Sequence, residues 1–292
     1  MRWRIRPWTA GLGEKVVERL WQAAMPPSWP VLGAGIAQLG EGLVAEAGSD
    51  LVGFAAVHMA GSIPLILVDP ACQRRGIGTS LLAAALERLR AGGVLSVTAG
   101  NGGGSYIWPG VPEDLSAAVQ FFGSRGWQHS HDTLDLVADL AAYHPPPGAR
   151  ERAASIGITV TRATGSDLTD VLAFEAAAFP NWLRWFSAAG EDVLLARDSA
   201  RNIAGTLLLD GPGAGTVFAP MLGPAAGTIG CVGVAAPLQG RGIGTALVAG
   251  ASEILRDAGT RNCHIGWTTR ESFYRQAGYR PWRRYAMFSS PA

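Results

Sequence analysis

The chain is poor in residue types that point to several functional classes. Lys15 is its only lysine among 24 basic residues, and the net charge is +1. This balance argues against a large electrostatic surface for nucleic acid. The three cysteines, Cys72, Cys231 and Cys263, are scattered without the spacing of metal ligands. We therefore expect reduced packing cysteines, no metal and no nucleic-acid partner.

Long apolar runs are also missing. No stretch of about 18 or more uncharged apolar residues predicts a membrane span, and the first residues, MRWRIRPWTAG, lack the apolar core of a signal peptide. We expect a cytoplasmic protein with no membrane association. Hydrophobic residues make up 48% and charged residues 16% of the 292 residues, which predicts a globular chain of two domains or one large one.

A short glycine-rich motif occurs twice. The segment QRRGIGT at 73–79 returns 166 residues later as QGRGIGT at 239–245. Each copy follows an apolar, strand-like run and opens a helical pattern. Glycine lets backbone N–H groups approach a ligand closely, and a helix N-terminus adds free N–H groups and a positive dipole end. The repeat predicts a duplicated domain with a pyrophosphate cradle in each copy.

Neither copy matches a common nucleotide motif. A P-loop needs a lysine after its last glycine, and no lysine is present there. The dinucleotide fingerprint needs a third glycine, where this chain has Leu81 and Leu247. A phosphate at this motif would therefore be held by backbone N–H groups, without a P-loop lysine and without the third glycine of the dinucleotide fingerprint.

Periodicity predicts the same order of elements in both halves, an α+β fold with a mixed central sheet flanked by helices in each of two tandem domains. The Pro-rich, charged segment around HPPPGARERA is the best linker candidate. We divide the chain into an N-terminal domain at 1–145, a linker at 146–157 and a C-terminal domain at 158–292. Ser166 is expected to cap a helix over Asp167–Ala178, and Tyr279–Phe288 is expected to close the second domain as a strand.

The segments LVDPACQRRGIGTSLL and GVAAPLQGRGIGTALV resemble the coenzyme A-binding segment of the GNAT acetyltransferase superfamily, and AAVQFFGSRGW and SFYRQAGY resemble its later helix and closing glycine–aromatic pair. The resemblance implies two GNAT-like domains, acetyl-CoA as donor and an amine as acceptor. It assigns the pyrophosphate to the two glycine motifs. The residues concerned are Arg74, Arg75, Gly76, Ile77, Gly78 and Thr79, and Gln239, Gly240, Arg241, Gly242, Ile243, Gly244 and Thr245.

The two copies differ at a position that matters for the chemistry. GNAT enzymes commonly protonate the departing thiolate with a tyrosine four residues before the final glycine. That position is Tyr274 before Gly278 in the second copy, but Phe122 before Gly126 in the first. The resemblance therefore implies a catalytic C-terminal domain with Tyr274 as general acid. The N-terminal domain is expected to lack this route, and its binding of acetyl-CoA stays open.

Other site residues follow from the strand before the second motif. Backbone N–H groups around Val232, Gly233 and Val234 are expected to stabilise the developing oxyanion. Gly233 is expected to mark a bulge or the close approach of a ligand, with simple packing as the alternative. No acidic residue lies on that strand, so Glu175 and Asp210 are the nearest candidates for a base. Ordinary surface or capping roles are the favoured reading for both residues, and a water chain could remove the proton instead.

The acceptor is suggested by aromatic residues of the second half. Trp182 and Trp267 are candidates to bind it, because aromatic faces suit both sugars and cations; Trp185 lies beside Trp182, and core packing is the alternative for all three. The tandem pattern resembles two-domain glucosamine or glucosaminide N-acetyltransferases, with a loop at 100–112 that could shape the acceptor site. Mycothiol synthase is a more distant tandem relative, whose usual asparagine-bearing segment is not evident at Trp267–Glu271. A CoA-binding sensor without turnover and a peptide acetyltransferase are the other readings.

Overall fold

The computed structural model describes the chain except residues 1, 9–13, 31–40, 102–106, 190–191 and 215–216. The chain divides into two compact units. Unit 1 holds Met1–Leu134 and Arg283–Ala292, and unit 2 holds Asp135–Trp282. The observed division falls near the predicted boundary at 145, but it gives the chain from Arg283 onward to unit 1.

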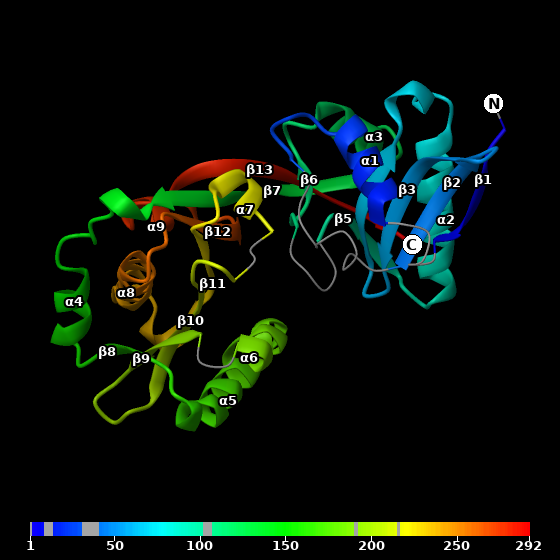
Figure 1. Cartoon of the computed structure of the whole chain (residues 1–292). Helices are drawn as coiled ribbons and strands as arrows, with labels where there is room; N and C mark the ends of the chain where they lie inside the picture. Colours follow the sequence, from blue (N-terminus) through cyan, green and yellow to red (C-terminus); the bar gives the residue numbers. More distant parts are fainter. Residues whose placement is uncertain (1, 9–13, 31–40, 102–106, 190–191, 215–216) are drawn as a thin grey trace. The chain divides into compact units, whose positions relative to one another are not determined.

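Unit 1 has the predicted α+β arrangement around a mixed sheet. Its strands lie in the order β1-β2-β3-β4-β5-β13-β7, antiparallel from β1 to β4 and parallel between β4 and β5. Helices α1 and α2 pack against β3 and β4, as Figure 1 shows. The elements are β1 (Arg4–Trp8), α1 (Glu14–Ala24), β2 (Glu41–Ala47), β3 (Asp50–His58), β4 (Ser62–Val68), α2 (Ile77–Ala91), β5 (Ser96–Ala99), β6 (Val111–Pro112), α3 (Ser116–Gly123) and β7 (Gln128–Asp139).

The last strand of the chain completes the sheet of unit 1. Strand β13 (Arg280–Pro291) pairs with β5, where Ser289 lies opposite Thr98, and with β6, where Ala286 lies opposite Val111. The expected strand Tyr279–Phe288 therefore exists, but from Arg283 on it joins unit 1 instead of closing the second domain. The reason is that β5 offers an unpaired edge next to its parallel partner β4, and β13 fills it.

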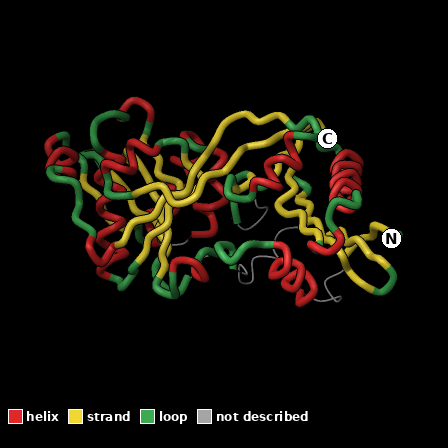
Figure 2. Tube along the Cα trace, turned by 90° about the horizontal axis from the view of Figure 1, so that it is seen from above, coloured by secondary structure: helices red, strands yellow, loops and turns green. Residues whose placement is uncertain are grey.

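Unit 2 repeats the same plan. Its strands lie in the order β7-β12-β11-β10-β9-β8, antiparallel from β8 to β11 and parallel between β11 and β12. Figure 2 shows strands in the interior of each unit with helices around them. The elements are α4 (Ala149–Ser155), β8 (Thr159–Arg162), α5 (Leu168–Ala178), α6 (Leu183–Ala189), β9 (Val193–Arg197), β10 (Ile203–Asp210), α7 (Ala219–Leu222), β11 (Ala226–Val234), α8 (Ile243–Asp257), β12 (Asn262–Thr268) and α9 (Glu271–Gln276).

Two local expectations need correction. The segment 146–157 is not only a linker, because it contains α4, which packs on α8 and forms an ion pair between Arg150 and Glu253. Ser166 does not cap α5, because it lies within a 3₁₀ turn (Gly165–Asp167) that precedes the helix and is itself capped by Thr164. Thr164 and Asp167 form a reciprocal capping box, in which the Asp167 carboxylate accepts the Thr164 N–H at 2.8 Å.

Candidate active site

The two glycine motifs adopt the same conformation. Gly76 and Gly242 have φ of 89° and 85°, left-handed values that favour glycine, and each stands directly before the first residue of a 15-residue helix, α2 or α8. The side-chain amide of Gln73 donates to Val68 O at 3.1 Å, and that of Gln239 donates to Val234 O at 3.0 Å. These glutamines therefore fix the strand-to-helix turn, after which the helix begins with the backbone N–H groups predicted to form a cradle.

The neighbours of the two cradles differ. Beside Gly76 lies the indole of Trp3, 3.6 Å from the point where a Cβ would stand. Beside Gly242 lies Arg152 of α4, whose Nε is 3.8 Å from the matching point. The second cradle therefore has a guanidinium against it, from the segment predicted as a linker.

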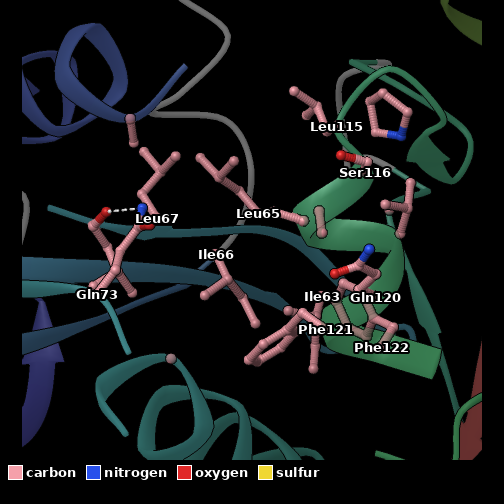
Figure 3. Close-up of a pocket in the computed structure, with 18 of the residues that line it drawn as sticks. Ile63, Leu65, Ile66, Leu67, Gln73, Leu115, Ser116, Gln120, Phe121 and Phe122 are labelled. Atoms are coloured by element: carbon pink, nitrogen blue, oxygen red, sulfur yellow. Dashed lines mark hydrogen bonds between the residues drawn. The ribbon is translucent and has the colours of Figure 1, made fainter. Parts of the chain in front are cut away.

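In unit 1 a cavity of about 830 Å³ opens between β4, the first motif and α3. Figure 3 shows Ile63, Ile66 and Leu67 of β4 on one side, with Phe121 and Phe122 of α3 near them. Phe122 is buried against Trp127 and Phe288, with ring centroids 4.9 and 6.0 Å apart. The N-terminal unit thus offers room for a ligand, lined by apolar side chains where a proton donor would be needed. Of the 100–112 loop, residues 102–106 lie outside the described residues.

In unit 2 the strands β11 and β12 part beside a bulge. Their parallel pairing ends at Ile229 and Ile265, and two residues further on Cys231 and Trp267 both have positive φ, of 49° and 52°. The register between β10 and β11 shifts here by one residue, between Gly230 and Gly233. The bulge expected at Gly233 is therefore present directly before it. The close neighbour of Gly233 is the Phe179 ring, 2.5 Å from the point where a Cβ would stand, which is side-chain packing, the alternative reading of this glycine.

Tyr274 comes from α9 and is 93% shielded from solvent, with a relative exposure of 7%. Its neighbour Phe273 packs on Gly244 of the second motif, just as Phe121 packs on Gly78 in unit 1. This shared packing places Tyr274 and Phe122 at equivalent positions. Burial first, and the neighbouring Cys231 next, raise the pKa of Tyr274 to about 12. At neutral pH the hydroxyl is therefore protonated, as a proton donor must be.

Glu175 of α5 is fully buried, which differs from a surface role. Its Oε1 accepts a hydrogen bond from Thr206 Oγ1 of β10 at 2.5 Å, and its Oε2 has no hydrogen-bond partner among the described residues. Burial raises the pKa of Glu175 to about 7. Burial, and then the charge of Glu175, raise the pKa of the Cys231 thiol to about 12. Cys231 therefore interacts electrostatically with both Glu175 and Tyr274.

The other predicted residues divide into two groups. Trp182 stacks on Phe179 with ring centroids 4.8 Å apart, so an aromatic wall runs from Trp182 to Gly233. Asp210, by contrast, lies at the exposed end of β10 and accepts a hydrogen bond from Thr228 Oγ1 at 3.1 Å. The structure therefore brings Glu175 to the bulge and leaves Asp210 at the far end of the strand.

Two polar side chains of this set are replaced by phenylalanine in unit 1. Phe122 stands for Tyr274, and the strand register puts the buried Phe54 where unit 2 has Thr206. Sequence reasoning missed Thr206 and Cys231, because neither belongs to a motif. Aligning the two repeats strand by strand would have drawn attention to the exchange of Phe54 for Thr206.

Two features are absent among the described residues, a cluster of metal ligands and a membrane-spanning helix. In that part of the chain no three His, Cys, Asp or Glu side chains gather as metal ligands would. No helix within it is long and apolar enough to cross a membrane.

Comparisons with known proteins concern the family and the fold. The family model described as the acetyltransferase (GNAT) family matches residues 5–102 and 166–279. A mycothiol acetyltransferase from Clavibacter sepedonicus is 30% identical over 212 residues, which are 66% of this chain and 60% of that protein. This chain thus spans less than two thirds of that relative.

Solved structures carry the same fold. A GCN5-related glucosamine N-acetyltransferase region in a fungal multi-domain GH3 beta-N-acetylglucosaminidase superposes with a TM-score of 0.91 at 26% identity, over 99% of this chain and 38% of that one. A tandem GNAT protein from the clavulanic acid biosynthesis pathway has a TM-score of 0.67 at 18% identity, over 99% of this chain and 98% of its own. At 18% identity, the similarity to the tandem GNAT protein shows the fold alone.

Proposed function

Because the chain belongs to the GNAT acetyltransferase family, we propose that it transfers the acetyl group of acetyl-CoA to the amine of a small acceptor, an amino sugar such as glucosamine or a glucosaminide. The reaction takes place in unit 2. There the second glycine motif holds the pyrophosphate of acetyl-CoA, with Arg152 beside Gly242 as an additional cation.

The observation that carries this proposal is that two buried titratable groups, Glu175 beside the β10–β11 bulge and Tyr274 of α9, both interact electrostatically with Cys231 of β11. Glu175, with its pKa raised to about 7 by burial, accepts the proton of the attacking amine. Backbone N–H groups of Val232–Val234 stabilise the oxygen of the thioester carbonyl as charge develops on it. Tyr274 donates its proton to the departing sulfur. One C–N bond forms, one C–S bond breaks, and the proton balance closes through the two side chains.

Two observations favour an amino sugar as acceptor. The fungal structure with a TM-score of 0.91 is described as a glucosamine N-acetyltransferase region. In this chain, Trp182 and the half-exposed Trp267 offer aromatic faces that suit the apolar face of a sugar ring.

A second acceptor class also has a specific observation behind it. The relative from Clavibacter sepedonicus is named a mycothiol acetyltransferase, which favours the amine of a thiol precursor. In either case unit 1 retains a cradle and a cavity of about 830 Å³ but no side chain for proton transfer in the place of Tyr274. We propose that it binds CoA without turning it over, and that the chain is not a sensor without activity.

An acceptor screen tests the proposal. The full chain is incubated with acetyl-CoA and, separately, with glucosamine, short chitin fragments, aminoacyl thiol precursors and peptide amines, and thiol release is measured with the mass of the product. We expect N-acetylated glucosamine or glucosaminide. Activity on peptides alone would discard the sugar, and CoA binding without any acetylated product would support the sensor.

A further inference from the structure

Trp267 in unit 2 has a backbone conformation that its side chain disfavours. Its φ of 52° lies in the left-handed region, although it stands inside β12 and is not a glycine. Its side chain does not compensate by burial, because 45% of it is exposed. A residue in such a conformation persists only where its surroundings impose it, and such residues concentrate at functional sites.

A buried carboxylate holds this conformation. Asp135 of β7 is fully buried, and its Oδ1 accepts the backbone N–H of Trp267 at 2.9 Å. The Oδ2 atom of Asp135 lies 3.1 Å from Nε2 of His264, which precedes Trp267 by three residues on β12. A hydrogen bond to a carboxylate is shorter and stronger than one between neutral groups, so it can fix a strained residue.

The histidine is itself fixed by aromatic packing. His264 is nearly fully buried, and its ring centroid lies 4.6 Å from that of Phe218 and 5.8 Å from that of Trp282. The Asp135–His264 pair is therefore a rigid element beneath the end of β12. It adjoins the turn in which the N–H of Arg270 bonds Thr268 Oγ1 at 3.0 Å, before α9 and Tyr274 begin.

The repeat provides an internal comparison. In unit 1 the pairing of β4 with β5 ends at Ala99, and two residues later Asn101 has φ of 56°, as Trp267 has after Ile265. The N–H of Asn101 is held by the carbonyl groups of Trp108 and Pro109. Asparagine tolerates this conformation far better than tryptophan. At this left-handed position unit 1 thus carries asparagine, which tolerates the conformation, whereas unit 2 carries a strained tryptophan.

We infer that Asp135 and His264 are positioning residues that hold Trp267 in the left-handed conformation so that its indole forms a wall of the acceptor site. The wall suits a ring with an apolar face, such as that of an amino sugar. The inference rests on the proposed function for the identity of the acceptor, but the strain and its support are properties of the fold alone.

Trp267→Asn copies the residue of unit 1 and provides the main test. We expect a Tm equal to or above that of the wild type, because the strain is relieved, together with a KM for glucosamine raised about tenfold and an unchanged KM for acetyl-CoA. Asp135→Asn keeps the size of the side chain and removes its charge. We expect it to lower the Tm in the wild-type background, clearly less so in the Trp267→Asn background, and to raise the glucosamine KM.

The two readouts separate this inference from the proposed function. If the wild type acetylates no amine, the proposed function fails, and the Tm values of the four proteins still test the support of Trp267. A Tm of Trp267→Asn several degrees below that of the wild type would overturn the inference, as would equal Tm losses for Asp135→Asn in both backgrounds. An unchanged glucosamine KM in an active Trp267→Asn enzyme would overturn the acceptor wall.

Discussion

Replacing Tyr274 with phenylalanine is the sharpest test of the proposed chemistry. The change removes one hydroxyl from a side chain that is almost fully buried, and unit 1 already carries phenylalanine at the equivalent place, Phe122. The aromatic packing therefore stays intact. Loss of a general acid lowers the rate by about 10²-fold to 10⁴-fold, which corresponds to about 3–5 kcal/mol of transition-state stabilisation. Thiol release from acetyl-CoA, with saturating acceptor, measures the loss.

Tyr279→Phe is the matched control. Tyr279 is also buried, and its hydroxyl bonds Ser252 at 2.8 Å on α8. Removal of the Tyr279 hydroxyl deletes a structural hydrogen bond worth about 1 kcal/mol. Because Tyr279 has no part in the proposed proton transfer, kcat should stay within threefold of the wild-type value. If Tyr274→Phe retains a kcat within about threefold of the wild type, or if both variants lose the same activity, Tyr274 is not the general acid.

Four further predictions concern the carboxylates and the thiol. The wild-type kcat/KM should rise with pH through about 7, as Glu175 ionises, and Glu175→Gln should abolish that rise and lower the rate about 10²-fold. Because the native state holds the Glu175 proton more tightly than the unfolded chain does, the free energy of unfolding of the wild type falls as the pH rises from about 4.5 to 7. Glutamine cannot ionise, so the Tm of Glu175→Gln relative to the wild type should be higher at pH 8 than at pH 5. A Tm difference that is the same at both pH values would contradict this. Because the Cys231 thiol has a pKa near 12, mass spectrometry after incubation with acetyl-CoA alone should detect no acetyl adduct on it, and an adduct would indicate a covalent intermediate. Asp210→Asn should keep its rate within threefold, since Asp210 lies at the exposed end of β10, and a tenfold loss would reopen its role as base.

Local patterns predicted much of the fold because they depend on neighbours in the sequence. Both motifs form left-handed turns directly before a helix, as the helical pattern that each motif opens indicated. Tyr274 and Phe122 were found by counting from a glycine, and the matching packing of their neighbours Phe273 and Phe121 on the motif glycines supports the comparison. Family membership is confirmed by a match over both halves.

Features set by distant contacts could not be predicted in this way. The sequence of β13 has the pattern of a strand, but nothing in it selects the free edge of β5 in unit 1. Glu175 lies in a helix whose sequence carries no motif, and only the fold buries it against Thr206. The support of Trp267 by Asp135 joins residues 132 positions apart, which no periodicity records.

The central claim is that only the second of two similar cradles supports turnover. Gly242 and Gly76 have nearly the same left-handed φ, of 85° and 89°, so an alanine strains both turns to the same degree. The direct measurement is N-acetylation of glucosamine by Gly242→Ala and Gly76→Ala at limiting acetyl-CoA. We predict at least a tenfold loss of kcat/KM for Gly242→Ala and a value within threefold of the wild type for Gly76→Ala. Equal losses, or a loss confined to Gly76→Ala, would contradict the account.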